Sequence, residues 1–106
     1  EIMDVLKADP MIERVVDFKS STVGFGAYRL RLEIEFNGHS LFMSDAEQSY
    51  LKQEFAEVKN DYEAFKRFSV DYADRMPRLI GNEIDRIEAN LRKHFPALHH
   101  IDIEIN

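Results

Sequence analysis

Three ionisable side chains alternate along the last segment of the chain, and their types could bind a metal ion. His100, Asp102 and Glu104 are separated by single isoleucines, so on a strand they would share one face, with neighbours about 7 Å apart. A metal ion normally needs three or four converging ligands. A metal ion bound here would therefore need further ligands from another element or from a second copy of the chain. The alternative is the polar, solvent-facing side of an edge strand.

The other histidines do not extend this set. His99 is adjacent to His100, and adjacent residues of a strand point to opposite faces. We expect His39, beside the pair Asn37-Gly38, to be an exposed turn residue, and His94 to be a favourable charge at a helix C-terminus. The chain has no cysteine, which excludes disulfides and thiolate metal sites.

Catalytic patterns are weak. The acidic residues of the second half alternate with Arg and Lys at helical spacing, which is typical of a solvated helix face. We see no nucleophile–base pair and no pocket pattern, so we do not expect an enzyme. Gly24-Phe25-Gly26 is too short for a phosphate-binding loop and precedes a strand. The acidic residues considered are Asp71, Asp74, Glu83, Asp85 and Glu88.

Length and charge limit the number of domains and the kinds of partner that this chain could have. The 106 residues predict one domain, 1–106, small enough that oligomerisation could add appreciable stability. A net charge of −6 without a clustered basic face disfavours nucleic acid as a partner. No apolar run approaches the roughly 18 residues of a membrane span. Because helix signals begin at Glu1, we expect the chain to be excised from a longer protein.

The first elements are a short helix and a strand. Apolar spacing predicts a helix over Ile2–Ala8, and Asp9-Pro10 ends it because the residue before proline avoids the α region. β-branched and aromatic residues predict a strand over Ile12–Val23. One face of this strand is predicted to carry Val16, Phe18 and Ser20.

A hairpin is expected to follow. Gly24 and Gly26 provide the permissive backbone of a turn. Tyr28–Phe36 alternates strictly between apolar and charged residues, which predicts a strand with one face in the core. Asn37-Gly38 is a two-residue hairpin signal, so we expect His39–Met43 to return as a third strand.

From Ser44 the periodicity becomes helical. Ser44-Asp45-Ala46-Glu47 is an N-cap pattern, and a helix is predicted up to Val58. A second helix starts at Tyr62 and ends or kinks at Met76-Pro77, and a third spans Arg78–His94. The intervening aromatic stripe is predicted to be mainly core, with part of it available for a dimer interface. Its members are Tyr50, Phe55, Tyr62, Phe65, Phe68 and Tyr72.

Together these elements predict an α+β sandwich with an antiparallel-rich sheet and helices on one face. The last strand, His100–Ile105, is expected to pair beside the first one.

This order of elements resembles the soluble C-terminal domain of cation diffusion facilitator transporters. Three segments, 59–63, 83–88 and 100–105, are similar in sequence to the branch of this family that contains the mitochondrial zinc transporter nine and its bacterial relatives. The resemblance implies a small ferredoxin- or metallochaperone-like fold, with residues 39–76 as a helical insertion before the last helix. It also implies a homodimeric, regulatory domain of a proton-coupled, zinc-type efflux transporter, with no catalytic residues. The full protein would be attached to a membrane, with this domain on the cytoplasmic or mitochondrial matrix side.

The resemblance also suggests where a metal could bind. Zinc-binding histidines of better-known members fall near Val16, Glu33, Glu104 and Asn106 of this chain, where two carboxylates and no histidine stand. The candidate ligands for Zn²⁺ or another divalent cation are therefore Glu33, His100, Asp102 and Glu104. The alternative function is a free-standing α+β ligand-binding or interaction module unrelated to transport.

Overall fold

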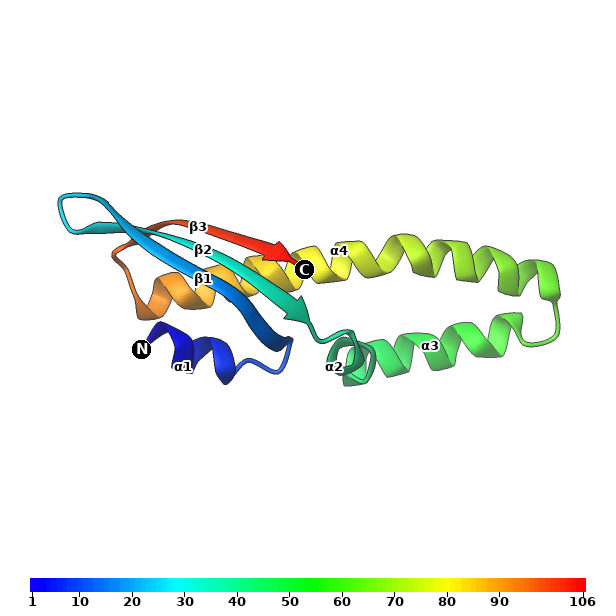
Figure 1. Cartoon of the computed structure of the whole chain (residues 1–106). Helices are drawn as coiled ribbons and strands as arrows, with labels where there is room; N and C mark the ends of the chain where they lie inside the picture. Colours follow the sequence, from blue (N-terminus) through cyan, green and yellow to red (C-terminus); the bar gives the residue numbers. More distant parts are fainter. The chain divides into compact units, whose positions relative to one another are not determined.

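The computed structural model describes all 106 residues and divides them into two compact units. The first unit contains Glu1–Gly38 and Glu83–Asn106, and the second contains His39–Asn82. The long helix α4 (Tyr62–His94) contributes residues to both (Figure 1). None of the helices has the combination of length and apolar character that crossing a membrane requires.

The first unit is built on a three-stranded mixed sheet. Its order is β1 (Ile12–Gly24), β2 (Ala27–Phe36), β3 (Leu98–Ile105), with β1 antiparallel and β3 parallel to β2. The α+β class is confirmed, but the expected pairing of the last strand with the first is wrong. A parallel pair needs a long crossover, and the helices between β2 and β3 provide it. The central strand, β2, is the one with the most buried apolar residues.

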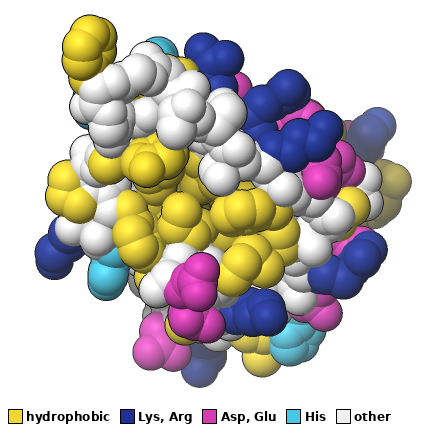
Figure 2. Space-filling model, turned by 60° about the vertical axis from the view of Figure 1, so that its left-hand side comes forward, with side chains coloured by type: hydrophobic (Ala, Val, Ile, Leu, Met, Phe, Trp, Pro, Cys, Tyr) yellow, Lys and Arg dark blue, Asp and Glu magenta, His cyan; other side chains and the backbone are white.

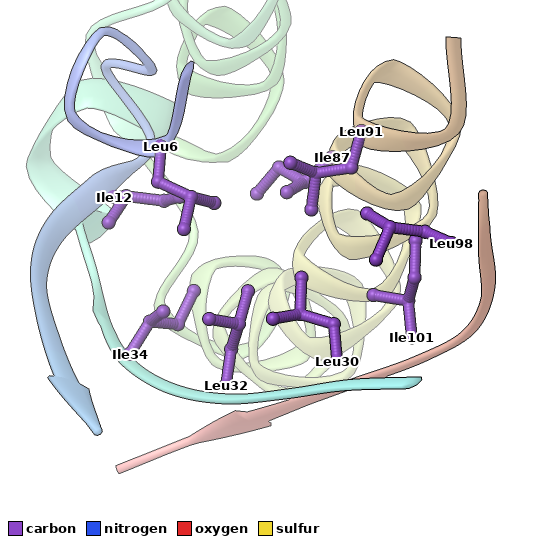
Figure 3. Packing of buried hydrophobic residues seen from close by; sticks show 9 residues of the cluster. All are labelled: Leu6, Ile12, Leu30, Leu32, Ile34, Ile87, Leu91, Leu98 and Ile101. Atoms are coloured by element: carbon purple, nitrogen blue, oxygen red, sulfur yellow. The ribbon is translucent and has the colours of Figure 1, made fainter. Parts of the chain in front are cut away.

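The core of the first unit lies between one face of the sheet and two helices. Figure 3 shows its side chains converging from β2, β3, α4 and α1 (Ile2–Lys7). The alternation predicted for β2 is confirmed in its middle, where Leu30, Leu32 and Ile34 are buried, whereas Tyr28 at the start of the predicted face is 42% exposed. Burial of each core side chain contributes about 1.5–3 kcal/mol. The cluster comprises Leu6, Ile12, Leu30, Leu32, Ile34, Ile87, Leu91, Leu98 and Ile101.

Strand β1 departs from its predicted alternation. Val15 and Phe18 pack against the core, whereas Val16 is exposed. The pairing register with β2 shifts between Ile12 and Arg14 and again between Val15 and Asp17. Such bulges insert an extra residue and change which side chains face the core, so the prediction that Val16 and Phe18 share a face is wrong.

The second unit is helical, and the strand predicted at 39–43 is wrong. It consists of α2 (Gly38–Phe42), α3 (Asp45–Val58) and the first part of α4. Both edges of β2 are occupied, by β1 and β3, so a hairpin strand after Asn37-Gly38 has no edge to pair with. His39 accordingly lies in a helix rather than in a turn.

The helix boundaries follow the sequence signals in part. The hydroxyl of Ser44 accepts the backbone N–H of Glu47 at 3.3 Å, which confirms the predicted N-cap. The predicted end or kink at Met76-Pro77 does not divide the helix, because α4 continues through Pro77. Tertiary contacts fix the helix on both sides of the proline, at Arg75 and at Ile87, and offset the hydrogen bond that proline lacks.

We predict that Leu30→Ala destabilises the protein by roughly 2–5 kcal/mol, because Leu30 is 0% exposed and its truncation leaves a cavity. Val70→Ala, at a residue that is 61% exposed, is the control and should change the free energy of unfolding by less than about 0.5 kcal/mol. Urea unfolding followed by circular dichroism measures both. Equal effects would contradict the assignment of the core.

Candidate functional site

The residues predicted to bind metal lie together on the outer face of the sheet. His100, Asp102 and Glu104 are exposed, while Ile101 between them is buried. Glu33 of β2 is the register neighbour of Glu104. The structure therefore brings Glu33 and Glu104 side by side and places the other two residues further along the same strand.

Charged residues of both signs surround these side chains. Asp17 of β1 is paired in register with Glu33, which puts three carboxylates in a row across the sheet. The adjacent row is mainly basic, and Nη2 of Arg31 lies 3.7 Å from Oε1 of Glu104. The residues line a polar depression of about 110 Å³. The adjacent row contains Lys19, Arg31 and Asp102.

This arrangement does not fit a preorganised zinc site. No three side chains of His, Asp or Glu converge closely enough to hold a metal ion. The register neighbour of His100 is Arg29 rather than a carboxylate, and Arg31 already compensates Glu104. Zinc prefers imidazole and thiolate ligands, so carboxylates alone would hold it weakly. The metal site stays a prediction.

An ion pair between a buried carboxylate and a partly exposed arginine joins two distant parts of the first unit. The carboxylate of Asp9 is buried; its Oδ1 accepts the N–H of Met11 at 3.0 Å and Nη2 of Arg86 at 2.9 Å. Nε of Arg86 donates to Glu83 at 2.8 Å. The hydrogen bond that Arg86 donates to Asp9 raises the pKa of Arg86 above its ordinary value, and the hydrogen bond that it donates to Glu83 has a smaller effect in the same direction. The pair ties the turn after α1 to α4.

The second unit contains a polar cluster that the sequence did not reveal. Glu47 is only 3% exposed, and its two carboxylate oxygens accept Nη2 and Nε of Arg75 at 3.0 and 3.3 Å. The Arg75 guanidinium lies 3.9 Å from the centre of the Tyr50 ring, a cation–π arrangement. The hydrogen bonds that Arg75 donates to Glu47 raise the pKa of Arg75. This cluster joins α3 to α4.

Aromatic rings complete the cluster. Phe68 stacks on Tyr72 with ring centres 5.6 Å apart, and Tyr50 lies 6.3 Å from Phe68. The Tyr72 hydroxyl is buried near Glu47 without a partner at hydrogen-bonding geometry. Burial, and then the nearby Glu47 carboxylate, raise the pKa of Tyr72. These three rings pack against one another but are only partly buried, so the predicted aromatic core is present as a half-buried cluster.

The rest of the aromatic stripe is exposed. Phe55 is 62% exposed, Tyr62 71% and Phe65 50%, so these rings are not core residues. In the first unit, an apolar hollow of about 420 Å³ opens beside the loop that leads into β3. Figure 2 shows apolar side chains gathered there. The two units therefore each present apolar surface that a partner could cover.

His94 lies in the last turn of α4, as predicted for a basic residue at a helix C-terminus. Its Nδ1 is 2.9 Å from the carbonyl oxygen of Asn90. His94 borders both the apolar hollow and a second depression whose lining includes the acidic residues Glu1, Asp4 and Asp9.

We predict that Arg75→Ala destabilises the helical unit on the order of 3 kcal/mol, because it leaves the Glu47 carboxylate buried without a counter-charge. Glu47→Ala should cost less, since the Arg75 side chain is 31% exposed and can be hydrated. Hydrogen exchange of the α3 amides and urea unfolding measure the difference, with Arg78→Ala as an exposed control. A larger loss for Glu47→Ala would contradict this account of the cluster.

Comparison with known proteins gives relatives along almost the whole chain. The mitochondrial proton-coupled zinc antiporter SLC30A9 of Mus musculus is 30% identical over 107 residues, and the same protein of Homo sapiens is equally similar; each match covers 98% of this chain and 19% of the relative. Metal tolerance protein C4 of Arabidopsis thaliana is 30% identical over 114 residues, which cover 98% of this chain and 24% of that protein.

No family model matches the chain, and no solved structure matches it either. The chain spans 19% to 24% of the length of the curated relatives named above. Its similarity to these zinc antiporters and to the metal tolerance protein confirms the predicted resemblance to the cation diffusion facilitator transporters.

Proposed function

We propose that this chain is the C-terminal domain of a proton-coupled, zinc-type cation efflux transporter, in which it pairs two copies and regulates transport. The observation that carries the proposal is the 30% identity to named zinc antiporters over 98% of the chain. Because the chain accounts for only 19% of those relatives, we infer that a membrane domain is its covalent partner. The relatives are named as transporters, which supports a role other than catalysis.

The regulation that we propose is mechanical. The first unit has one continuous core that joins the sheet to α1 and α4, so it can move as a rigid body. Two such bodies that pack together can change their relative angle and bias the attached membrane helices towards one access state. No step passes through a bound metal ion, because the outer face of the sheet holds no converging ligand set.

The location follows from the same reasoning. In the full-length protein this domain would lie beside the membrane, on the cytoplasmic or the mitochondrial matrix side. The antiporters that support the proposal are named as mitochondrial, which favours the matrix side.

Transport by the full-length protein tests the proposal. In liposomes with a pH gradient, we expect the purified protein to move zinc, and we expect the Leu30→Asp variant to transport more slowly because a charge in the core unfolds the regulatory domain. Zinc flux is followed with a trapped fluorescent indicator, and Val70→Asp is the exposed control. Absence of zinc flux in the unaltered protein would contradict the proposed function.

Light scattering and zinc calorimetry test the isolated chain. We expect a mass of twice the 12.5 kDa of one chain without added metal, because pairing does not depend on an ion in this proposal. A divalent cation attracted to the outer face of the sheet would meet Glu33 and Glu104 first, so we expect zinc to bind weakly. The double variant Glu33→Gln/Glu104→Gln should abolish the heat of zinc binding. Asp71→Asn is the control. Tight zinc binding that requires His100 and creates the dimer would contradict the mechanical account.

A further inference from the structure

The exposed face of α3 carries an open groove of about 690 Å³. It lies on the side of the helix away from Glu47, which contacts α4 through Arg75. Phe42 and Phe55 are 41% and 62% exposed. The amide of Gln48 donates to the carbonyl oxygen of Phe42 at 2.8 Å and so holds the start of the groove against the helix.

The second unit has little core of its own. Between His39 and Asn82, the only buried residues are Leu41 and Glu47. Units of about 40 residues usually need support from metals, disulfides or oligomerisation. The chain has no cysteine for a disulfide and no group of His, Asp or Glu that could hold a metal ion, so association is the remaining way to support this unit.

The residues of the groove are self-complementary about its midpoint. Two phenylalanines, Phe42 and Phe55, close its ends. Inside them lie an acid and a base, Asp45 and Lys52. Between these two charges the groove is lined by Gln48, Ser49 and Leu51.

A two-fold axis makes use of this order. In an isologous contact, residue i meets residue j of the partner, and j meets i. If two α3 helices lie antiparallel with the axis between Gln48 and Ser49, each Asp45 faces the partner's Lys52, and the exposed Phe42 of α2 and Phe55 of α3 lie at the edges of the contact. Asp45 and Lys52 are seven positions apart, about two helical turns, so both lie on one face. The apolar hollow of the first unit has no comparable charge pattern.

We propose that two copies of this chain associate through the outer faces of their α3 helices, packed antiparallel around Gln48 and Ser49. The contact joins Asp45 to the partner's Lys52 twice and covers Phe42 and Phe55. This inference rests on the pairing of copies in the proposed function and names the surface that performs it.

Charge exchange tests the contact. Asp45→Lys or Lys52→Asp alone turns two attractive contacts into two repulsive ones, and we expect the dimer to weaken by at least about tenfold at low ionic strength. The double variant Asp45→Lys/Lys52→Asp restores opposite charges, and we expect its dissociation constant to return to within about threefold of the original. Sedimentation equilibrium measures association, and circular dichroism confirms the helix content. Unchanged association in the single variants, or no rescue in the double one, overturns the proposal.

A cysteine reporter tests the geometry. Because the chain lacks cysteine, Ser49→Cys introduces one thiol next to the proposed axis, and mild oxidation should give a disulfide-linked dimer. Gln53→Cys places the thiol one turn further along α3 and off the groove, and it should remain largely uncrosslinked. Equal crosslinking of the two variants overturns the antiparallel arrangement.

These experiments also distinguish failure of the α3 contact from failure of dimerisation as such. One possible result is a dimer that is disrupted by Phe95→Asp, in the apolar hollow, but not by the α3 variants. In that case the two copies do pair, but the α3 contact is wrong. A chain that stays monomeric at all concentrations overturns both, whereas zinc flux by the full-length protein is judged independently. Capture of a different protein by α3 without self-association also overturns the proposal.

Discussion

Leu30, Leu32 and Ile34 project from β2 into one cluster with Ile87 and Leu91 of α4. This contact between the central strand and a helix that is distant in sequence organises the first unit. It places β1 and β3 on the two edges of β2 and leaves only the opposite face of the sheet for charged residues. The charged face is therefore a consequence of the core, and its alternating signs balance one another instead of converging on an ion.

The second unit is held by a different kind of interaction. Where the first unit has nine buried apolar side chains in one cluster, the second relies on Glu47, Arg75 and the rings around them. This ion pair fixes which surfaces meet, but it adds little net stability because the buried Glu47 carboxylate loses its water. In such a unit the surfaces of α3 and α4 that face each other are fixed, whereas apolar side chains on the outer surface remain exposed to solvent. This difference is the physical reason to look for a partner at α3.

The sequence predicted what depends on local periodicity and missed what depends on distant contacts. The alternation of β2 and the cap at Ser44 are local signals, and both were confirmed. The bulges of β1, the parallel pairing of β3 and the continuity of α4 through Pro77 are set by the rest of the fold. For the candidate metal-binding residues, the alternating sequence of the last strand correctly predicted that His100, Asp102 and Glu104 lie on one face of the sheet. The pair Glu47–Arg75 is 28 positions apart and Asp9–Arg86 is 77 apart, so no local pattern could reveal them.

The most direct test of this account is hydrogen exchange of the unaltered chain over a series of protein concentrations. If a second copy completes the helical unit, protection of the α3 amides rises with concentration, while protection of β2 stays constant because its core lies within one chain. Equal protection of α3 at all concentrations, under conditions where light scattering records both monomer and dimer, would contradict the central claim.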